Sequence, residues 1–368
     1  MDFGFSPEQD MMRAAARKLL DAECPSTVVR AMLGDPTAHH PALWRHLADL
    51  GAMGILIPAD FGGQGGSFLD LVVLLEEMGK SLLPGPFFAT SLLGSLTITL
   101  AGSPAQQRAL LPALANGERL ATLTLDADQG AITTTAEPAA DGYRLRGEQA
   151  FVMDAHVADT LIVAAHTPGG GLTLFALEAR ATGVEITPLR TVDMSRRLTQ
   201  VRLDVMLPAT AVLGAVGGGA PVVQRVLQHA RAGLAVEAVG VAQRALDLSV
   251  AYANERKQFG RPIGSFQAIK HKCVDMMVAV ETARSLAYYA TWAVTENASD
   301  VETAVAMAKS YAGDIGKTVT SEAIQVHGGI GFTWEHDIHL YHRRALAIAA
   351  AFGSAVEHRE TVARSLVG

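Results

Sequence analysis

The sequence predicts an α+β multidomain protein with a helical N-terminal domain, a central antiparallel β domain and a C-terminal four-helix bundle. Apolar residues recur at helical spacing in the first third of the chain, alternate with polar residues in the middle, and return to helical spacing in long segments after that. We place the domains at residues 1–118, 119–215 and 216–368. A chain of 368 residues with 49% hydrophobic residues can bury more than one core.

The N-terminal domain begins with a well-marked helix. Ser6 is a typical N-cap, Pro7 suits the first turn, and Gln9 completes a capping box, so a helix should run to about residue 20. The glycine-rich stretch over residues 51–66 predicts an irregular loop. Further helices are expected over residues 40–50, 69–79 and 87–101.

The middle and C-terminal segments differ in their periodicity. Short alternating runs predict strands over residues 121–125, 142–146, 160–164, 172–177 and 199–204. Long apolar-periodic runs predict helices over residues 222–255, 266–295 and 301–326, and a last helix from about 337 towards 352. Long helices rich in small residues pack closely, which favours a bundle and subunit interfaces.

Composition excludes several classes of protein. The net charge of −7 and the lack of a long Lys/Arg cluster argue against nucleic-acid binding. Cys24 and Cys273 are isolated, which argues against a disulfide framework and fits a reducing compartment. The sequence shows neither a signal segment nor an apolar run of membrane-spanning length, so we expect a cytoplasmic protein with no membrane span.

Two glycine-punctuated stretches carry the strongest functional signal. Residues 256–267, Arg-Lys-Gln-Phe-Gly-Arg-Pro-Ile-Gly-Ser-Phe-Gln, join two predicted helices. Guanidinium groups pair with phosphate and phenyl rings cover flat rings, so this stretch suits an anionic, flat ligand. Residues 325–332, Gln-Val-His-Gly-Gly-Ile-Gly-Phe, allow close approach of a ligand to the backbone. Helix capping explains both stretches equally well from the residues alone.

Together the two stretches resemble the acyl-CoA dehydrogenase family of FAD flavoproteins, at the segments by which one subunit reaches the FAD of its neighbour. The resemblance implies FAD as cofactor, an acyl-CoA substrate and a tetramer, possibly with a second acyl-CoA dehydrogenase subunit. The residues that it places at the cofactor are Arg256, Phe259, Gln267, Gln325, Gly328 and Gly329.

The middle domain departs from the family pattern. The family's flavin-covering loop appears here as a segment beginning at Thr124, and its Trp-Ile-Thr strand as Phe151-Val-Met153. In the family the threonine hydroxyl of that strand donates to flavin N5, which a methionine side chain cannot do. Phe151 and the backbone N–H of Met153 remain able to contact a flavin. Asp126 and Asp128 add negative charge that would repel a pyrophosphate lying close by.

The catalytic base of the family is also absent. Desaturation of an acyl thioester needs a group that removes the α-proton, and the family supplies one glutamate at either of two positions. The matching residues here are Ala230 and Phe352, and neither can take a proton. Arg231, which follows the first position, is expected to bind substrate.

Glu237 is the nearest replacement, seven residues beyond Ala230 on the same predicted helix. That separation is two helical turns, about 10 Å, which is longer than the side chain. The alternative is a structural role, in which a buried Glu237 pairs with an arginine of a neighbouring helix such as Arg244 or Arg284.

The histidines do not indicate a metal site. His336, His339 and His342 are three residues apart, but only two of them can share a helical face, and no carboxylate or cysteine completes a ligand set. We therefore expect no metal. His229 and His271 are expected to be solvated or hydrogen-bonded.

Three functional hypotheses remain. In the first, the chain resembles short bacterial family members that lack the glutamate and complete the FAD site of a Glu-bearing partner, acting on bulky, steroid-like CoA thioesters in lipid or steroid catabolism. In the second, it is a self-sufficient homo-oligomeric acyl-CoA dehydrogenase that uses Glu237 or another base. In the third, it is a helical scaffold or acyl-carrier protein without flavin.

Overall fold

The computed structural model describes residues 5–126, 132–169 and 171–367, which form two compact units. The helical unit contains the described residues up to 29, residues 72–83 and the chain from 231 onwards. The sheet unit contains residues 30–71 and 84–230. The helical and β segments follow each other as expected, whereas the three domain boundaries remain a prediction.

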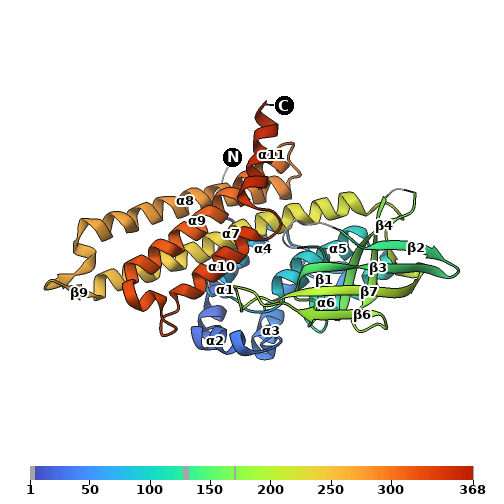
Figure 1. Ribbon diagram of the computed structural model, residues 1–368, viewed down its shortest axis with the longest axis horizontal. Coiled ribbons are helices and arrows are strands. Elements are labelled where there is room, and N and C mark those ends of the chain that lie inside the picture. Colours follow the sequence, from blue (N-terminus) through green and yellow to red (C-terminus); the bar gives the residue numbers. More distant parts are fainter. Residues whose placement is uncertain (1–4, 127–131, 170, 368) are drawn as a thin grey trace. The chain divides into compact units, whose positions relative to one another are not determined.

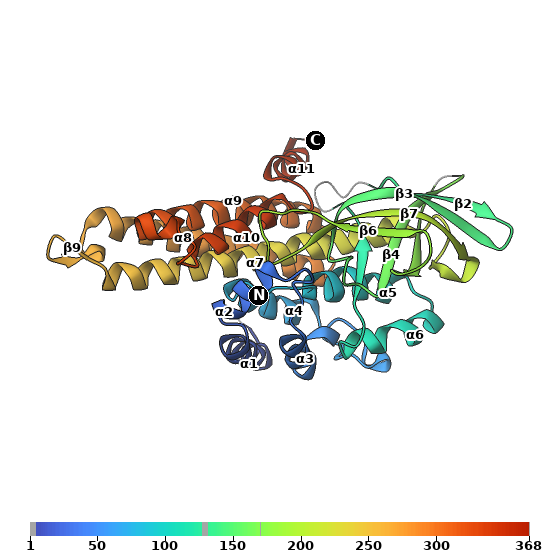
Figure 2. The ribbon, with the colours of Figure 1, turned by 60° about the horizontal axis from the view of Figure 1, so that its bottom comes forward.

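The helical unit is built on long helices that run side by side in both ribbon views (Figures 1 and 2). Its elements are α1 (Pro7–Glu23), the end of α4 (Phe68–Lys80), most of α7 (Gly219–Glu255), α8 (Gln267–Thr295), α9 (Val301–His327), α10 (Ile338–Ala350) and α11 (Ala355–Val367). The capping box predicted at Ser6 is present. The last predicted helix ends earlier, at Ala350, and a separate helix follows it.

Two glycines allow α4 and α7 to touch through their backbones. A Cβ atom on Gly79 would lie 2.4 Å from the Glu237 carbonyl oxygen, and one on Gly240 would lie 2.1 Å from the Glu76 carbonyl oxygen. Real Cβ atoms do not approach backbone so closely, so only glycine fits at either position. This close contact holds the part of α7 that contains Glu237 against α4.

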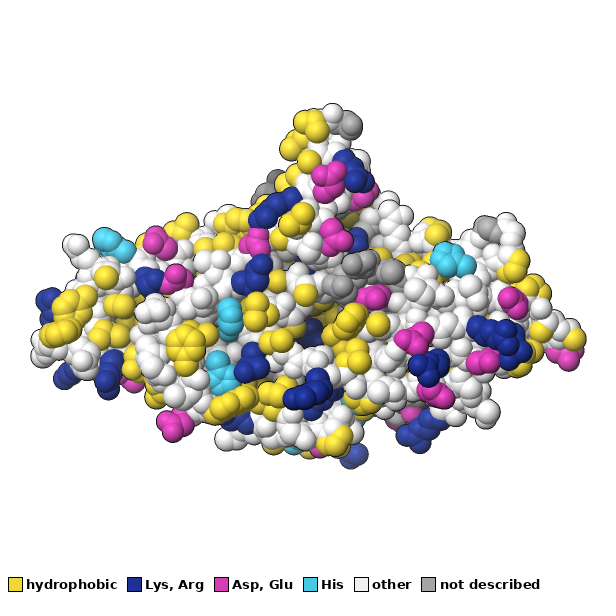
Figure 3. Space-filling model, viewed as in Figure 1, with side chains coloured by type: hydrophobic (Ala, Val, Ile, Leu, Met, Phe, Trp, Pro, Cys, Tyr) yellow, Lys and Arg dark blue, Asp and Glu magenta, His cyan; other side chains and the backbone are white. Residues whose placement is uncertain are grey.

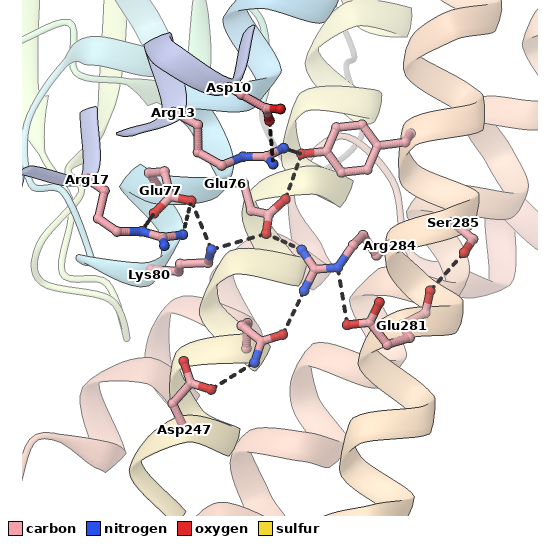
Figure 4. Close-up of polar contacts among 12 residues, drawn as sticks. Asp10, Arg13, Arg17, Glu76, Glu77, Lys80, Asp247, Glu281, Arg284 and Ser285 are labelled. Atoms are coloured by element: carbon pink, nitrogen blue, oxygen red, sulfur yellow. Dashed lines mark hydrogen bonds and ion pairs between the residues drawn. The ribbon is translucent and has the colours of Figure 1, made fainter. Parts of the chain in front are cut away.

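A network of charged and polar side chains connects α1, α4, α7 and α8 (Figure 4). Glu76 and Glu77 on α4 are buried, and each carboxylate has basic partners. Glu77 accepts from Arg17 at 2.9 and 3.0 Å, and Lys80 bridges both glutamates. Burial opposes ionisation of Glu76, but Arg284 and Lys80 outweigh it, so the pKa of Glu76 is lowered. Buried carboxylates are tolerated because they are paired.

The sheet unit contains an eight-stranded, mainly antiparallel sheet in the order β6-β7-β3-β2-β4-β5-β8, with β1 paired to β4. The strands are β1 (Ala121–Thr124), β2 (Thr135–Ala139), β3 (Gly142–Met153), β4 (Thr160–Thr167), β5 (Gly171–Glu178), β6 (Val184–Pro188), β7 (Leu198–Pro208) and β8 (Val212–Leu213). The sequence predicts an antiparallel central β domain, and most pairs are antiparallel; the β1–β4 pair and a short β2–β4 contact are parallel.

The helices of the sheet unit differ from expectation where packing overrides local pattern. The predicted helix over residues 87–101 is a π-helix (Phe88–Gly94) followed by α5 (Ser95–Ala101). Gly94 lies against β1, where a Cβ atom would be 2.7 Å from the Ala121 side chain. The predicted loop over 51–66 contains two short 3-10 helices, Ala52–Gly54 and Ala59–Phe61. The remaining helices are α2 (Ser26–Gly34, which crosses the unit boundary), α3 (Pro41–Asp49) and α6 (Pro104–Ala115).

Basic and acidic side chains are interspersed on the face shown in Figure 3, rather than gathered into one patch. Within the part of the chain that the structure describes, every helix is too short or too polar to cross a membrane.

Candidate functional site

The first glycine-punctuated stretch forms an exposed hairpin between α7 and α8, made of β9 (Lys257–Gln258) and β10 (Arg261–Pro262) (Figure 1). At its tip Phe259 adopts a left-handed backbone conformation, with φ of 53°, and is 92% exposed. Its ring meets Phe266 edge-on at 6.0 Å. Arg256 and Gln267 flank the hairpin and are exposed. A large apolar ring and an arginine are therefore presented to the surroundings of this chain.

The second stretch ends α9 and leaves its glycine backbone open. Gln325 is exposed on the last turn of α9, and Gly328 ends the helix with φ of 63°. A Cβ atom on Gly328 or Gly329 would have no neighbour within 4 Å. Gly331 differs, because a Cβ atom there would lie 2.8 Å from the Ile324 carbonyl oxygen. The first two glycines thus leave room for a ligand, while the third is required by the turn itself.

Packing brings the two stretches to the same end of the helical unit. The Tyr252 ring, one turn before Arg256, stacks on His327 at 4.6 Å between centroids. His327 directly precedes Gly328. An exposed arginine, an exposed phenyl ring and an open glycine backbone therefore lie on neighbouring elements, and these groups suit a ligand with phosphates and flat rings. In this respect the residues fit an FAD, for which they were predicted.

The two positions expected to hold a base are sealed and apolar. Ala230 is completely buried and Phe352 is 1% exposed. Phe352 adopts φ of 56° in the turn after α10, a conformation that is uncommon for a bulky residue. Arg231 donates from Nε to the Phe352 carbonyl oxygen at 2.9 Å. In this chain, therefore, the arginine predicted to bind substrate contacts the backbone of that turn.

Two further basic groups pack against the same turn. Lys309 is 1% exposed and donates from Nζ to the carbonyl oxygens of Ala349 at 3.2 Å and Gly353 at 3.4 Å. Burial lowers its pKa to about 7, and the charge of Arg231 adds to the effect. His358 is also buried, and burial followed by the nearby Lys309 charge lowers its pKa to about 4.

Glu237 has the structural role given as the alternative, but with a different partner. Its Oε1 lies 2.6 Å from Nη1 of Arg344, and both side chains are almost completely buried. Arg344 also donates to the Leu83 carbonyl oxygen at 3.2 Å. The predicted partners Arg244 and Arg284 are wrong, because Arg284 is held by Glu76, and Arg244 bonds to Tyr341. A carboxylate engaged in this way is poorly placed to take a substrate proton.

The sheet unit holds the other predicted cofactor residues. Phe151 lies at an irregularity of β3, with φ of 54° and 41% of its surface exposed. Met153 is buried, and its carbonyl oxygen accepts from Thr122 at 2.8 Å. Thr124 is buried, and its hydroxyl lacks a partner within the described chain. Asp126 is partly buried, whereas Asp128 lies outside the described residues.

The three closely spaced histidines make separate contacts. The His336 ring lies 4.4 Å from that of His327, and the His339 ring meets Trp334 at 4.6 Å. His342 lies within hydrogen-bond distance of a threonine hydroxyl of α9, at 2.8 Å. Among the described residues no group of three His, Cys, Asp or Glu side chains is placed to hold a metal ion.

The other two histidines occupy different surroundings. His229 is buried, with its Nδ1 2.7 Å from the Arg225 carbonyl oxygen, and burial lowers its pKa to about 4. His271 is exposed on α8.

Sequence reasoning missed Lys309, Arg344 and His358 as parts of these sites. Lys309 is a charged residue within an otherwise apolar helical pattern, which is the available signal, whereas Arg344 and His358 stand beside other charged residues and give no such signal. Their partners are distant in sequence, so the pattern alone does not show what they contact.

Known proteins match nearly the whole chain. The family described as acyl-CoA dehydrogenase, N-terminal domain, matches residues 6–118, and acyl-CoA dehydrogenase, C-terminal domain, matches residues 217–367. Acyl-CoA dehydrogenase IpdE2 of Mycolicibacterium smegmatis is 34% identical over 349 residues, which cover 95% of each chain.

Two solved structures share the fold over their full length. A chain of the ChsE4-ChsE5 complex from Mycobacterium tuberculosis has a TM-score of 0.92 and 28% identity, covering 100% of this chain and 99% of that one. A variant of the Tcur3481-Tcur3483 steroid ACAD has a TM-score of 0.87 and 32% identity, covering 97% of each chain.

Proposed function

Because this chain belongs to the acyl-CoA dehydrogenase family, FAD-dependent oxidoreductases that act on CH–CH bonds, we propose that it is the base-lacking subunit of a heteromeric enzyme. In this proposal its hairpin and glycine turn complete the FAD site of a second subunit, which carries the catalytic glutamate.

The observation that carries the proposal is a contrast within one chain. Phe259 is 92% exposed, whereas the residues at both base positions, Ala230 and Phe352, are at most 1% exposed. An exposed aromatic ring beside an exposed arginine is typical of a surface that another molecule covers. Glu237, the remaining candidate base, is held in a buried ion pair.

The residues of the exposed end have distinct roles in this proposal. When bound, FAD supplies the hydride acceptor for α,β-desaturation. Arg256 pairs with a phosphate oxygen, and Phe259 covers an apolar ring face. Gly328 and Gly329 let the cofactor approach the backbone, and Gln325 offers an amide for hydrogen bonding. The α-proton is removed by the glutamate of the partner.

The relatives support a proposal for the substrate class. One similar structure is a steroid ACAD made of two named chains, and another is a complex of ChsE4 with ChsE5. We infer a CoA thioester with a bulky, steroid-like acyl group as the substrate of the heteromeric enzyme, within lipid or steroid catabolism. A mixed tetramer is the assembly that this proposal requires.

Expression of the chain alone and together with a Glu-bearing homologue tests the proposal. We expect negligible dehydrogenase activity alone and turnover in the mixed assembly, because general-base catalysis contributes about 10²- to 10⁴-fold. Exchange of the homologue's glutamate for glutamine should abolish turnover, whereas Glu237→Gln in this chain should leave the rate per folded complex unchanged. Robust turnover by this chain alone that falls on Glu237→Gln would instead favour a self-sufficient enzyme.

A flavin measurement addresses the scaffold alternative. The mixed assembly should retain FAD through gel filtration, with its visible absorption bands. An assembly that forms stably but holds no flavin would support a scaffold or acyl-carrier role.

A further inference from the structure

A pair of histidines flanks the proposed cofactor turn in the sequence. His327 is the last residue of α9, and His336 belongs to the segment that leads into α10. Their ring centroids are 4.4 Å apart, and Tyr252 stacks on the other side of His327 at 4.6 Å. His327 is only 3% exposed. His327 directly precedes Gly328, and a Cβ atom on Gly331 would lie 3.2 Å from the His327 Cβ, so His327 packs against the turn that contains Gly328 and Gly329.

The hydrogen bonds of His327 determine where its proton lies. Its Nδ1 is 2.7 Å from the Ala323 carbonyl oxygen, which can only accept, so Nδ1 carries the hydrogen. The lone pair of the neutral ring is therefore on Nε2, which is buried and lacks a partner within the described chain. A second proton would have to bind at this buried nitrogen, next to another imidazole.

His336 has the opposite arrangement. Its Nδ1 accepts from the backbone N–H of Ile338 at 3.1 Å, so the neutral ring carries its hydrogen on Nε2. Protonation at Nδ1 would replace this acceptor by a donor that faces another donor. It would also place a positive charge at the N-terminus of α10, where the helix dipole is unfavourable to cations. Uptake of a proton by His336 thus breaks the contact that starts α10.

The elements around the pair carry other titratable and charged groups. α7 contributes Tyr252, the segment before α10 contributes Asp337 beside His336, and Arg343 of α10 lies over Trp334 at 5.3 Å. The pKa of His327 is lowered from 6.5 by burial and by repulsion from His336, against the effect of its bond to Ala323. Since the folded state favours the neutral ring, the stabilising contribution of His327 is present above pH 6.5 and declines as the pH falls below that value.

We propose that His327 and His336 form a proton-linked support for the Gly328–Gly329 turn, so that protonation of either ring opens the turn and releases the flavin. The inference rests on the proposed function, because it assigns the flavin to this turn. It adds a regulatory property: the cofactor is held at neutral pH and released in mild acid.

The test uses the chain assembled with a Glu-bearing homologue, and FAD as the probe. Flavin retention after gel filtration is measured from pH 8 to pH 5, and the histidine ring nitrogens are titrated by NMR over the same range. His336→Asn keeps a side-chain acceptor for the Ile338 N–H but does not titrate, and His327→Phe keeps the stack on Tyr252. His271→Gln, on the exposed surface of α8, is the matched control.

We expect the wild type and His271→Gln to lose flavin with the same midpoint below pH 7. His336→Asn should retain flavin to a lower pH, because one of the two rings whose protonation opens the turn is absent and only the buried His327 is left to take up a proton. In the NMR titration, His327 should take up its proton at higher pH in His336→Asn than in the wild type.

Two failures are distinguishable. If flavin is retained but its midpoint is the same in all four proteins, the inference is wrong and the proposed function stands. If the assembly holds no flavin at any pH, the proposed function and the inference are both wrong. Should His327→Phe fail to fold, the comparison of His336→Asn with the control still decides the question.

Discussion

Two regions of the helical unit differ in how far they expose functional side chains. The open end contains residues 256–267 and 325–332, and the sealed turn is formed by residues 351–354 after α10. At the open end Arg256, Phe259 and Gln325 are exposed, and Gly329 has free space around it. At the sealed turn the side chain of Phe352 is buried. The open end thus exposes groups suited to binding a ligand, whereas the residues at both positions expected to hold a base, Ala230 and Phe352, are buried.

In the proposed function, this difference separates binding from proton transfer within one fold. The sealed turn is held by Arg231 and Lys309, which bond to backbone carbonyls rather than to a side-chain acid. Carbonyl bonding by cations near a helix C-terminus is stabilising, so the turn keeps its geometry without a carboxylate. A chain without a carboxylate at this turn can therefore keep the fold that the proposed function requires.

The largest effect on stability is expected from Arg344→Met in the buried interior. The change removes the ion-pair partner of Glu237, and breaking a buried pair costs about 3–5 kcal/mol. Urea unfolding measures the loss. The double variant Glu237→Gln/Arg344→Met should recover much of it, because no buried charge loses its partner. A small loss in the single variant would mean that Glu237 is free to serve as a base, and the contrast between the two regions would weaken.

Arg256→Ala tests the open end. Charge-assisted hydrogen bonds contribute about 1.5–3 kcal/mol, so the affinity of the mixed assembly for FAD should fall about 10- to 100-fold. The unfolding midpoint should not change, because the side chain is exposed. Arg180→Ala, an exposed arginine of the sheet unit, should change neither property.

Gly329→Val sharpens the same test. A Cβ atom at that position has no neighbour within 4 Å, so we expect folding to be unaffected while FAD affinity falls. Unchanged flavin content in both Arg256→Ala and Gly329→Val would show that the cofactor does not reach this end.

The pH dependence of the stability of Lys309→Met tests how Lys309 is buried at the sealed turn. The pKa of Lys309 is about 7 in the folded chain, against 10.5 ordinarily, so the unfolded state binds more protons between these values. Wild-type stability should therefore rise with pH in that window, by up to about 1.4 kcal/mol per unit from this group. The rise should be absent from Lys309→Met but present in the exposed control Lys270→Met. Equal slopes in all three would mean that Lys309 is not buried in this way.

The smallest effect is expected from Thr124→Val in the sheet unit. The Thr124 hydroxyl is buried without a partner in the described chain, so an apolar residue of the same shape should leave stability unchanged or raise it by about 1 kcal/mol. If this chain's own sheet unit binds no flavin, the flavin content of the assembly should also be unchanged. A clear loss of flavin would mean that the sheet unit of this chain also binds a flavin. The open end would then not be the only cofactor-binding region proposed for this chain.

Local chemistry was enough to predict much of the fold and of the open end. The capping box at Ser6, the long periodic runs and the helix-breaking glycines act over a few residues, so their structures follow from neighbouring side chains. The missing bases at Ala230 and Phe352 are likewise visible from residue identity once the family resemblance is stated.

Long-range packing accounts for the rest. Arg344 lies 107 residues from Glu237, and Lys309 lies 44 residues from Gly353, so nothing local selects either partner. The parallel pairing of β1 with β4 and the stacking of His327 between Tyr252 and His336 also join distant segments. Periodicity shows that a residue is buried, but the identity of its neighbours depends on how whole helices and strands dock. A charge can be buried at low cost only where that docking supplies a partner. For this reason the ion pairs and the lowered pKa of Lys309 depend on the folded structure and cannot be predicted from the sequence alone.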